Sequence, residues 1–187
     1  LESYMNLTEQ KSRYFNFIGP QPVTLNFVDV QENNPKSIMI DYAVTEKADG
    51  ERYELFITNQ KGYLINAKSN VIDTGIEFTE VMDEWLFDGE YITKTKDNED
   101  IKLYMIFDVY WAGKTTPQPI HTYPFISRSP DDISRKTVFD DFMKIKDTFT
   151  FNKTSISIDA KTYEFGHLSD SKSKKNKLKI FAASKKI

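Results

Sequence analysis

The sequence predicts an α+β domain rich in antiparallel strands, and two features of the chain carry this prediction. Short apolar runs separated by turn residues dominate the chain from about residue 23 to residue 110, as expected for consecutive hairpins. A single longer amphipathic stretch, residues 131–149, has the spacing of a helix. Hydrophobic residues make up 39% of the chain and aromatic residues 14%, which is enough apolar surface for a packed core.

The first half of the chain is expected to contain four strands after an N-terminal segment. Residues 1–22 are interpreted as a helix or a linker, with a break at Gly19-Pro20. The four apolar runs that follow predict strands, with Gly62 in a turn and another break at Asp73-Thr74-Gly75. The predicted strands are Val23–Val28, Ile38–Val44, Tyr53–Ile57 and Tyr63–Ile65.

The second half is expected to hold a long hairpin, a helix and two more strands. Residues 87–92 and 103–110 form the hairpin strands, and the polar residues 97–100 form its tip. The helix is predicted to begin near Ser129-Pro130-Asp131-Asp132, with acidic side chains in its first turn. Strands follow at 155–159 and 161–165. The lysine- and serine-rich residues 170–179 are interpreted as a solvated loop, with a phosphate or RNA contact as the alternative.

Composition and net charge exclude several classes of protein. The chain has 187 residues and no cysteine, so disulfide frameworks and thiolate metal sites are excluded. Its net charge is −3, so any contact with nucleic acid must come from a local basic patch. Neither a secretion signal nor an apolar run long enough for a membrane helix is visible. The chain begins with Leu1, so we expect it to be a piece of a longer protein.

One lysine lies where covalent nucleotidyl transfer would need it. The segment Lys47-Ala48-Asp49-Gly50-Glu51-Arg52 follows one predicted strand and precedes the next. A lysine amine is nucleophilic only when neutral, so its pKa of about 10.4 must be lowered by burial or by a nearby cation. Gly50 would allow a tight turn beside a ligand. A surface hairpin with mixed charges is the alternative reading of this segment.

Three ordered motifs resemble those of the covalent nucleotidyltransferases, the superfamily of mRNA capping guanylyltransferases and polynucleotide ligases. The segment Lys47–Arg52 resembles motif I, K-x-D-G-x-R. Phe87-Asp88-Gly89-Glu90-Tyr91-Ile92 resembles motif III, and Leu103–Tyr110 resembles motif IIIa. Taken singly, the motif III segment could be a hairpin turn at Asp88-Gly89, and the motif IIIa segment could be a buried strand.

The resemblance implies a two-sheet nucleotidyltransferase fold, the ATP-grasp-like fold of DNA ligases and capping enzymes. Residues 23–187 would form a partial guanylyltransferase domain that lacks motif IV, motif V and the OB domain. The sequence is expected to stop just before motif IV at Ile187, so this piece alone is expected to be inactive. Lys68 stands where family members often carry an arginine, and a lysine cannot make a bidentate contact.

Context favours the capping branch. Gly19–Leu25 is similar to the segment ahead of the guanylyltransferase domain in capping enzymes of large DNA viruses, and Ser157–Gly166 with Leu178–Phe181 is similar to the region before motif IV. Such domains usually lie between an RNA triphosphatase and a methyltransferase. The alternatives are an ATP-dependent polynucleotide ligase that forms lysyl-AMP, and a non-catalytic interaction domain.

The implied reaction transfers GMP from GTP to Lys47 and then to 5′-diphosphate RNA, with Mg²⁺ or Mn²⁺ as cofactor. If the protein is viral, it would act in the host cytoplasm, in a viral factory, or in the virion. Asp88 is interpreted as a turn former, and His121 and His167 are assigned no role. The resemblance assigns Lys47 as nucleophile, Arg52, Glu90, Phe87 and Lys68 as nucleotide contacts, Glu90 also as a metal ligand, and Asp49, Gly50 and Asp108 as supporting residues.

Overall fold

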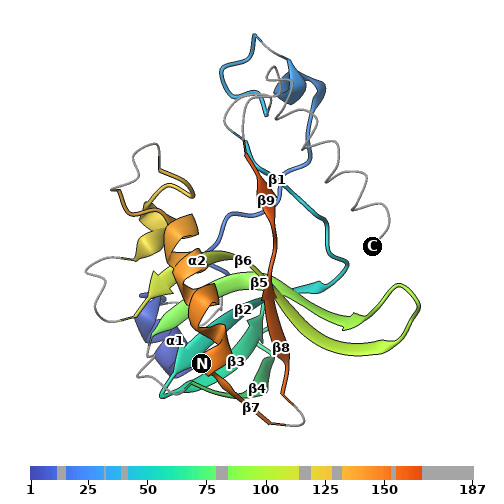
Figure 1. The fold of residues 1–187 in the computed structure, drawn as a ribbon. Helices are drawn as coiled ribbons and strands as arrows, with labels where there is room; N and C mark the ends of the chain where they lie inside the picture. The colour runs from blue at the N-terminus through green and yellow to red at the C-terminus, as the bar shows by residue number, and fades with distance from the viewer. Residues whose placement is uncertain are drawn as a thin grey trace. The chain divides into compact units, whose positions relative to one another are not determined.

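The computed structural model describes residues 1–11, 16–31, 33–38, 42–78, 84–113, 119–127, 132–152 and 155–165. The chain divides into two compact units. Unit 1 comprises Leu1–Gly19 and Asp49–Ala160, and unit 2 comprises Pro20–Ala48 and Lys161–Ile187. The elements are a mixture of strands and a few short helices, which confirms the α+β class (Figure 1).

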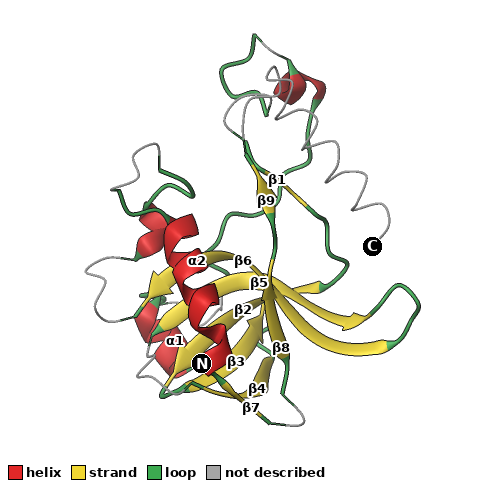
Figure 2. Cartoon of the chain, in the orientation of Figure 1, coloured by secondary structure: helices red, strands yellow, loops and turns green. Residues whose placement is uncertain are grey.

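A seven-stranded sheet forms the frame of unit 1 (Figure 2). Its order is β7-β4-β3-β2-β5-β6-β8, and all neighbours are antiparallel except β6 and β8, which run parallel. The strands are β2 (Glu51–Thr58), β3 (Lys61–Asn66), β4 (Val71–Glu77), β5 (Trp85–Lys94), β6 (Asp100–Ala112), β7 (Thr150–Phe151) and β8 (Ser157–Ala160).

The predicted hairpins are confirmed, although one glycine is placed differently. The turn between β2 and β3 consists of Asn59 and Gln60, whose φ angles are 49° and 61°, as in the two-residue turns that suit strand twist. Gly62 lies inside β3, where an added Cβ would come within 3.0 Å of the Thr74 hydroxyl. The hairpin of β5 and β6 closes at the predicted tip, where the Thr95 amide donates to the Glu99 carbonyl.

The expected break at Asp73-Thr74-Gly75 is wrong, because these residues lie within β4. Gly75 has a φ of +69° and so permits a local irregularity without ending the strand. Its carbonyl accepts hydrogen bonds from the side chains of Asn152 and Ser155. The sequence signal for a turn therefore marks a distortion at which another segment attaches.

One face of the sheet packs against α2 (Arg135–Ile145), which continues into a 3₁₀ turn, η3 (Lys146–Thr148). Phe139 and Phe142 are buried there among sheet residues. The predicted helix start was wrong: Ser134 caps the helix, and its hydroxyl accepts from the Thr137 amide. The first turn contains no acidic residue. A second 3₁₀ turn, η2 (Ile120–Thr122), precedes this helix and buries Ile120.

The opposite face of the sheet is covered by the N-terminal segment. In α1 (Glu2–Leu7), Tyr4 is fully buried and packs edge-on against Phe56 of β2, with ring centroids 5.8 Å apart. Ile65, Leu86 and Tyr110 complete this second apolar cluster. Residues 1–19 belong to unit 1, and the chain enters unit 2 at the Gly19-Pro20 break.

Unit 2 contains little regular structure among its described residues. Strands β1 (Val44–Thr45) and β9 (Tyr163–Glu164) form an antiparallel pair. The predicted strand at 23–28 is wrong, because Phe27–Val30 form a 3₁₀ turn, η1, with exposed apolar side chains. Of the strand predicted at 38–44, residues 39–41 lie outside the described part, as do residues 166–187 with the lysine-rich run.

No helix within the described ranges is both long and apolar enough to cross a membrane.

Candidate functional site

Lys47 lies in unit 2, two residues after β1. The chain just ahead of it is held by Thr162: the Thr45 hydroxyl donates to the Thr162 carbonyl at 2.6 Å, and the Thr162 hydroxyl donates to Glu46 at 2.8 Å. Lys47 is exposed, and Ala48, the next residue in the sequence, is buried. These contacts tie the two residues that precede the lysine to the segment that leads into β9.

Asp49 and Gly50 lead from this lysine into unit 1. Asp49 is exposed. An added Cβ on Gly50 would lie 2.7 Å from the Tyr91 carbonyl oxygen, which is closer than real Cβ atoms come. The absence of a side chain at Gly50 is therefore required by the neighbouring strand β5, which gives this glycine a packing reason that the sequence did not show.

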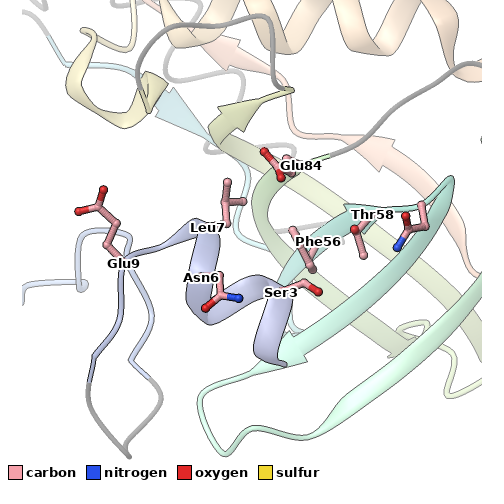
Figure 3. A pocket seen from close by; sticks show the side chains of 8 residues that line it. Ser3, Asn6, Leu7, Glu9, Phe56, Thr58 and Glu84 are labelled. Carbon is pink, nitrogen blue, oxygen red and sulfur yellow. The ribbon is translucent and has the colours of Figure 1, made fainter.

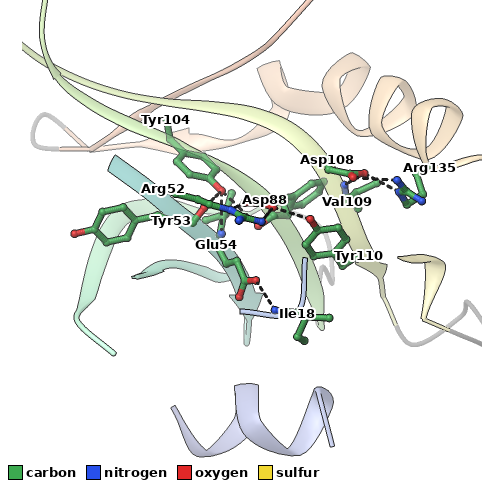
Figure 4. Close-up of polar contacts among 12 residues, drawn as sticks. Ile18, Arg52, Tyr53, Glu54, Asp88, Tyr104, Asp108, Val109, Tyr110 and Arg135 are labelled. Atoms are coloured by element: carbon green, nitrogen blue, oxygen red, sulfur yellow. Dashed lines mark hydrogen bonds and ion pairs between the residues drawn. The ribbon is translucent and has the colours of Figure 1, made fainter. Parts of the chain in front are cut away.

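Arg52 is held by a buried carboxylate. Alternation along β2 places Arg52, Glu54 and Phe56 on the face that α1 covers. The Arg52 Nε donates to Asp88 Oδ1 at 3.0 Å and its Nη2 donates to Asp88 Oδ2 at 2.5 Å (Figure 4). The Asp88 side chain is completely buried, whereas that of Arg52 is 21% exposed. This bidentate hydrogen bonding raises the pKa of Arg52 further, so the guanidinium stays charged.

Aromatic residues and a glycine surround the same guanidinium. The Tyr110 hydroxyl donates to Asp88 Oδ2 at 2.6 Å. The rings of Phe17 and Phe107 lie 5.3 and 6.0 Å from the Arg52 guanidinium carbon, within the range of cation–π contacts. Gly19 lies so close that an added Cβ would be 2.7 Å from Arg52 Nη2. Arg52 therefore has little conformational freedom.

A second buried carboxylate, Glu54, joins the N-terminal segment to this cluster. It accepts hydrogen bonds from the Tyr4 hydroxyl and, at 3.2 Å, from the Ile18 amide. Burial raises the pKa of Glu54 to about 7, and the charge of Asp88 adds to that increase, whereas the hydrogen bond from Tyr4 opposes it. Burial and the Glu54 charge likewise raise the pKa of Tyr4, so its hydroxyl remains a donor.

Glu90 is the cross-strand neighbour of Arg52, in direct register on β5, and is half-buried. Neighbours in such register share a face of the sheet. Within the part of the chain that the structure describes, no group of three or more histidine or acidic residues could hold a metal. Mg²⁺ often binds through only one or two carboxylates plus substrate phosphates, so a single carboxylate such as Glu90 fits that kind of site.

Three other predicted site residues are not brought to Arg52. Phe87 is fully buried in the core, 4.3 Å from the Phe142 ring centroid, and offers no open face to a base. Asp108 turns toward α2 and accepts from Arg135 Nε at 2.8 Å, so its role in this structure is to anchor the helix. Lys68 is exposed in the turn after β3.

The expectation that Asp88 forms a turn with Gly89 is wrong. The pair lies in the middle of β5. An added Cβ on Gly89 would come within 2.5 Å of the Tyr104 ring, so this glycine permits close packing between strands. Arg52 donates two hydrogen bonds to Asp88, so this aspartate is a partner of the motif arginine across the sheet.

The sequence reasoning missed Glu54, Tyr110, Phe17 and Gly19. The signal for Glu54 was present: it shares the face of β2 with the apolar Phe56, so a charge there needs buried partners. Tyr110 lay within a predicted strand, but its partner depended on a register that no local pattern gives.

A hollow of about 530 Å³ lies beside α1, away from these contacts (Figure 3). Among the described residues, its lining includes the carboxylates of Glu9 and Glu84 and no lysine or arginine, which does not suit a triphosphate. The lining residues are Ser3, Asn6, Leu7, Glu9, Phe56, Thr58, Asn59 and Glu84.

Comparisons with known proteins agree with the motifs. A family model described as mRNA capping enzyme, catalytic domain, matches residues 3–183. A probable mRNA-capping enzyme of Acanthamoeba polyphaga mimivirus is 37% identical over 105 residues, which are 55% of this chain and only 9% of that protein. Because the family model matches nearly all of its residues, the chain belongs to the family of mRNA capping enzyme catalytic domains.

Proposed function

We propose that this chain is the nucleotidyl-transfer part of an mRNA 5′-cap guanylyltransferase and that Lys47 carries the GMP. The observation that carries the proposal is the family match over residues 3–183, which includes the motif from Lys47 to Arg52. The exposed position of Lys47 and the fixed guanidinium of Arg52 support it. The finer fold assignment, a two-sheet nucleotidyltransferase, is part of the same proposal.

The chemistry runs in two balanced steps. In the first, the neutral Lys47 Nζ attacks the α-phosphorus of GTP; a P–N bond forms, the bond to the bridging oxygen breaks, pyrophosphate leaves and the amine loses a proton. In the second, a terminal phosphate oxygen of 5′-diphosphate RNA attacks the same phosphorus, the P–N bond breaks and Nζ regains a proton. Splitting the transfer in this way is covalent catalysis.

Residues of unit 1 would bind the nucleotide. Arg52 presents a rigid, charged fork, which suits a phosphate or ribose oxygen better than a flexible cation would. Glu90 beside it would accept from a ribose hydroxyl or hold a divalent ion, and Lys68 would contribute a phosphate contact. A bound Mg²⁺ or Mn²⁺ would offset the phosphate charge and favour departure of pyrophosphate.

Further parts of the proposal rest on likeness to the viral relative. The matched region spans 9% of that protein's length. We propose that the parent of this chain also contains RNA triphosphatase and methyltransferase domains, and that it acts in the host cytoplasm, in a viral factory, or in the virion.

The test is covalent labelling of the full-length protein with α-labelled GTP and a divalent ion, followed by denaturation. An acid-labile adduct that disappears in Lys47→Ala supports the proposal. Lys36→Ala is the matched control, because Lys36 is also an exposed lysine of unit 2. Labelling that survives Lys47→Ala refutes the assignment of the nucleophile. An adduct formed only with ATP indicates a ligase, and nucleotide binding without any adduct indicates a non-catalytic domain.

A further inference from the structure

We infer that Tyr110 and Gly19 are positioning residues for Arg52: together with Asp88 they fix the direction in which its guanidinium meets the nucleotide. This inference rests on the proposed function insofar as Arg52 is taken to contact GTP. The fixed orientation of the Arg52 guanidinium is a property of unit 1, and it can be tested without any reaction.

The first step in the argument is the geometry of the Arg52–Asp88 pair. An arginine carries five N–H donors in one plane, and Asp88 takes one from Nε and one from Nη2. A bidentate pair defines the plane and the rotation of the guanidinium, which a single contact would not do. The orientation of Arg52 is therefore only as well defined as that of Asp88.

Tyr110 fixes Asp88. Its hydroxyl donates to Oδ2, the same carboxylate oxygen that accepts from Arg52 Nη2. Both Tyr110 and Asp88 are buried, with 1% and 0% of their surface exposed, so water cannot easily replace a lost donor. Without the hydroxyl, the carboxylate would lose one of its buried donors, and the orientation of the arginine that it binds would be less well defined.

Gly19 lies against both the Tyr110 hydroxyl and the Arg52 guanidinium. A Cβ at this position would lie 2.0 Å from the Tyr110 hydroxyl oxygen and 2.7 Å from Arg52 Nη2. Any side chain there must therefore displace both members of the arrangement at once. Residue 19 therefore has to be a glycine because it lies against Tyr110 and Arg52. The sequence alone had indicated only a break in chain direction at this position.

The experiment compares GTP-dependent adduct formation in the wild type, Tyr110→Phe and Gly19→Ala, all in the full-length protein. The expected result is an increase in the KM for GTP of about three- to tenfold in Tyr110→Phe, the equivalent of one hydrogen bond, with kcat little changed. In an Arg52→Ala background, Tyr110→Phe should have no further effect on KM. Gly19→Ala should raise KM in the same manner.

Tyr104→Phe is the matched control. Tyr104 lies on the same strand and is also fully buried, but its hydroxyl bonds to backbone groups and not to the Asp88 carboxylate: it donates to the Tyr53 carbonyl at 2.8 Å and accepts from the Leu55 amide. It should lower the thermal midpoint while leaving KM unchanged. Equal KM effects of the Tyr110 and Tyr104 changes, or an undiminished effect in the Arg52→Ala background, would overturn the inference.

A nuclear magnetic resonance measurement separates this inference from the proposed function. Arg52 Nε–H, bonded to Asp88, should give a protected ¹⁵N–¹H signal that exchanges faster with water in Tyr110→Phe but not in Tyr104→Phe. If the wild type forms no adduct with GTP, the proposed function fails, yet this signal still decides whether Tyr110 positions Arg52. An unchanged exchange rate in Tyr110→Phe would refute the positioning role.

Discussion

Replacing Glu54 by glutamine should remove much of the pH dependence of unit 1 stability between about pH 4.5 and 7. The Glu54 side chain is fully buried, and the pKa is raised from 4.5 to about 7. Burial is the main cause. The groups that face this carboxyl are Tyr4, Asp88 and Arg52, of which Asp88 raises the pKa further and the other two lower it. Glutamine resembles the protonated acid in size and in having one acceptor oxygen.

The sign follows from proton linkage. The folded state binds the proton of Glu54 more tightly than the unfolded state, so its stabilising contribution is fully present below pH 4.5 and is lost as the pH rises through about 7. A difference between 4.5 and about 7 corresponds to roughly 3 kcal/mol in the free energy of unfolding, taken as an upper limit. Above pH 7 the variant should be the more stable protein.

The assay is urea denaturation of both proteins at several pH values from 4.5 to 8, with the free energy of unfolding plotted against pH. The wild-type curve should fall more steeply than that of Glu54→Gln. Glu77→Gln is the control, because Glu77 is exposed on β4 of the same sheet and should leave the curve unchanged. Parallel curves for the wild type and Glu54→Gln would refute the reasoning that burial dominates at this carboxyl.

Two further changes test local backbone structure, and both are measured by urea denaturation. Gln60→Gly should stabilise the protein by about 0.5–1 kcal/mol, because relief of the left-handed φ of 61° exceeds the entropy that glycine adds to the unfolded chain; a loss of stability would show that the Gln60 side chain contributes to packing. Ser134→Ala should cost about 1 kcal/mol through loss of the cap of α2, and no change would mean that water replaces the hydroxyl.

Local patterns predicted the hairpins of unit 1 well, because each depends on residues close in sequence. The apolar runs around Leu55 and Leu64 became β2 and β3, and the polar residues 97–100 became the tip of the next hairpin. The helix was also predicted, but its start moved to Ser134, where the capping hydroxyl outweighs the acidic residues at 131 and 132 as a start signal.

The errors arose where distant strands decide the outcome. Asp88-Gly89 resembles a turn when read alone, yet in β5 the aspartate meets Arg52 of β2 and the glycine meets Tyr104 of β6. The motifs identified Lys47, Arg52 and Glu90 as residues of interest. The surroundings of Arg52, however, come from segments up to 93 residues apart in the sequence, from Phe17 to Tyr110. Only the register of the sheet reveals that grouping.

The discontinuity of unit 1 has a consequence for where the chain can be shortened. The Pro-rich stretch after Gly19 looks like a natural place to begin a smaller protein. Starting there would remove Tyr4 and Ile18, leaving the Glu54 carboxylate without its two hydrogen-bond donors and opening the apolar surface around Phe56 and Leu86. Such a truncated protein would tend to aggregate through the sheet face that α1 otherwise covers. The first nineteen residues are therefore part of the minimal folding unit.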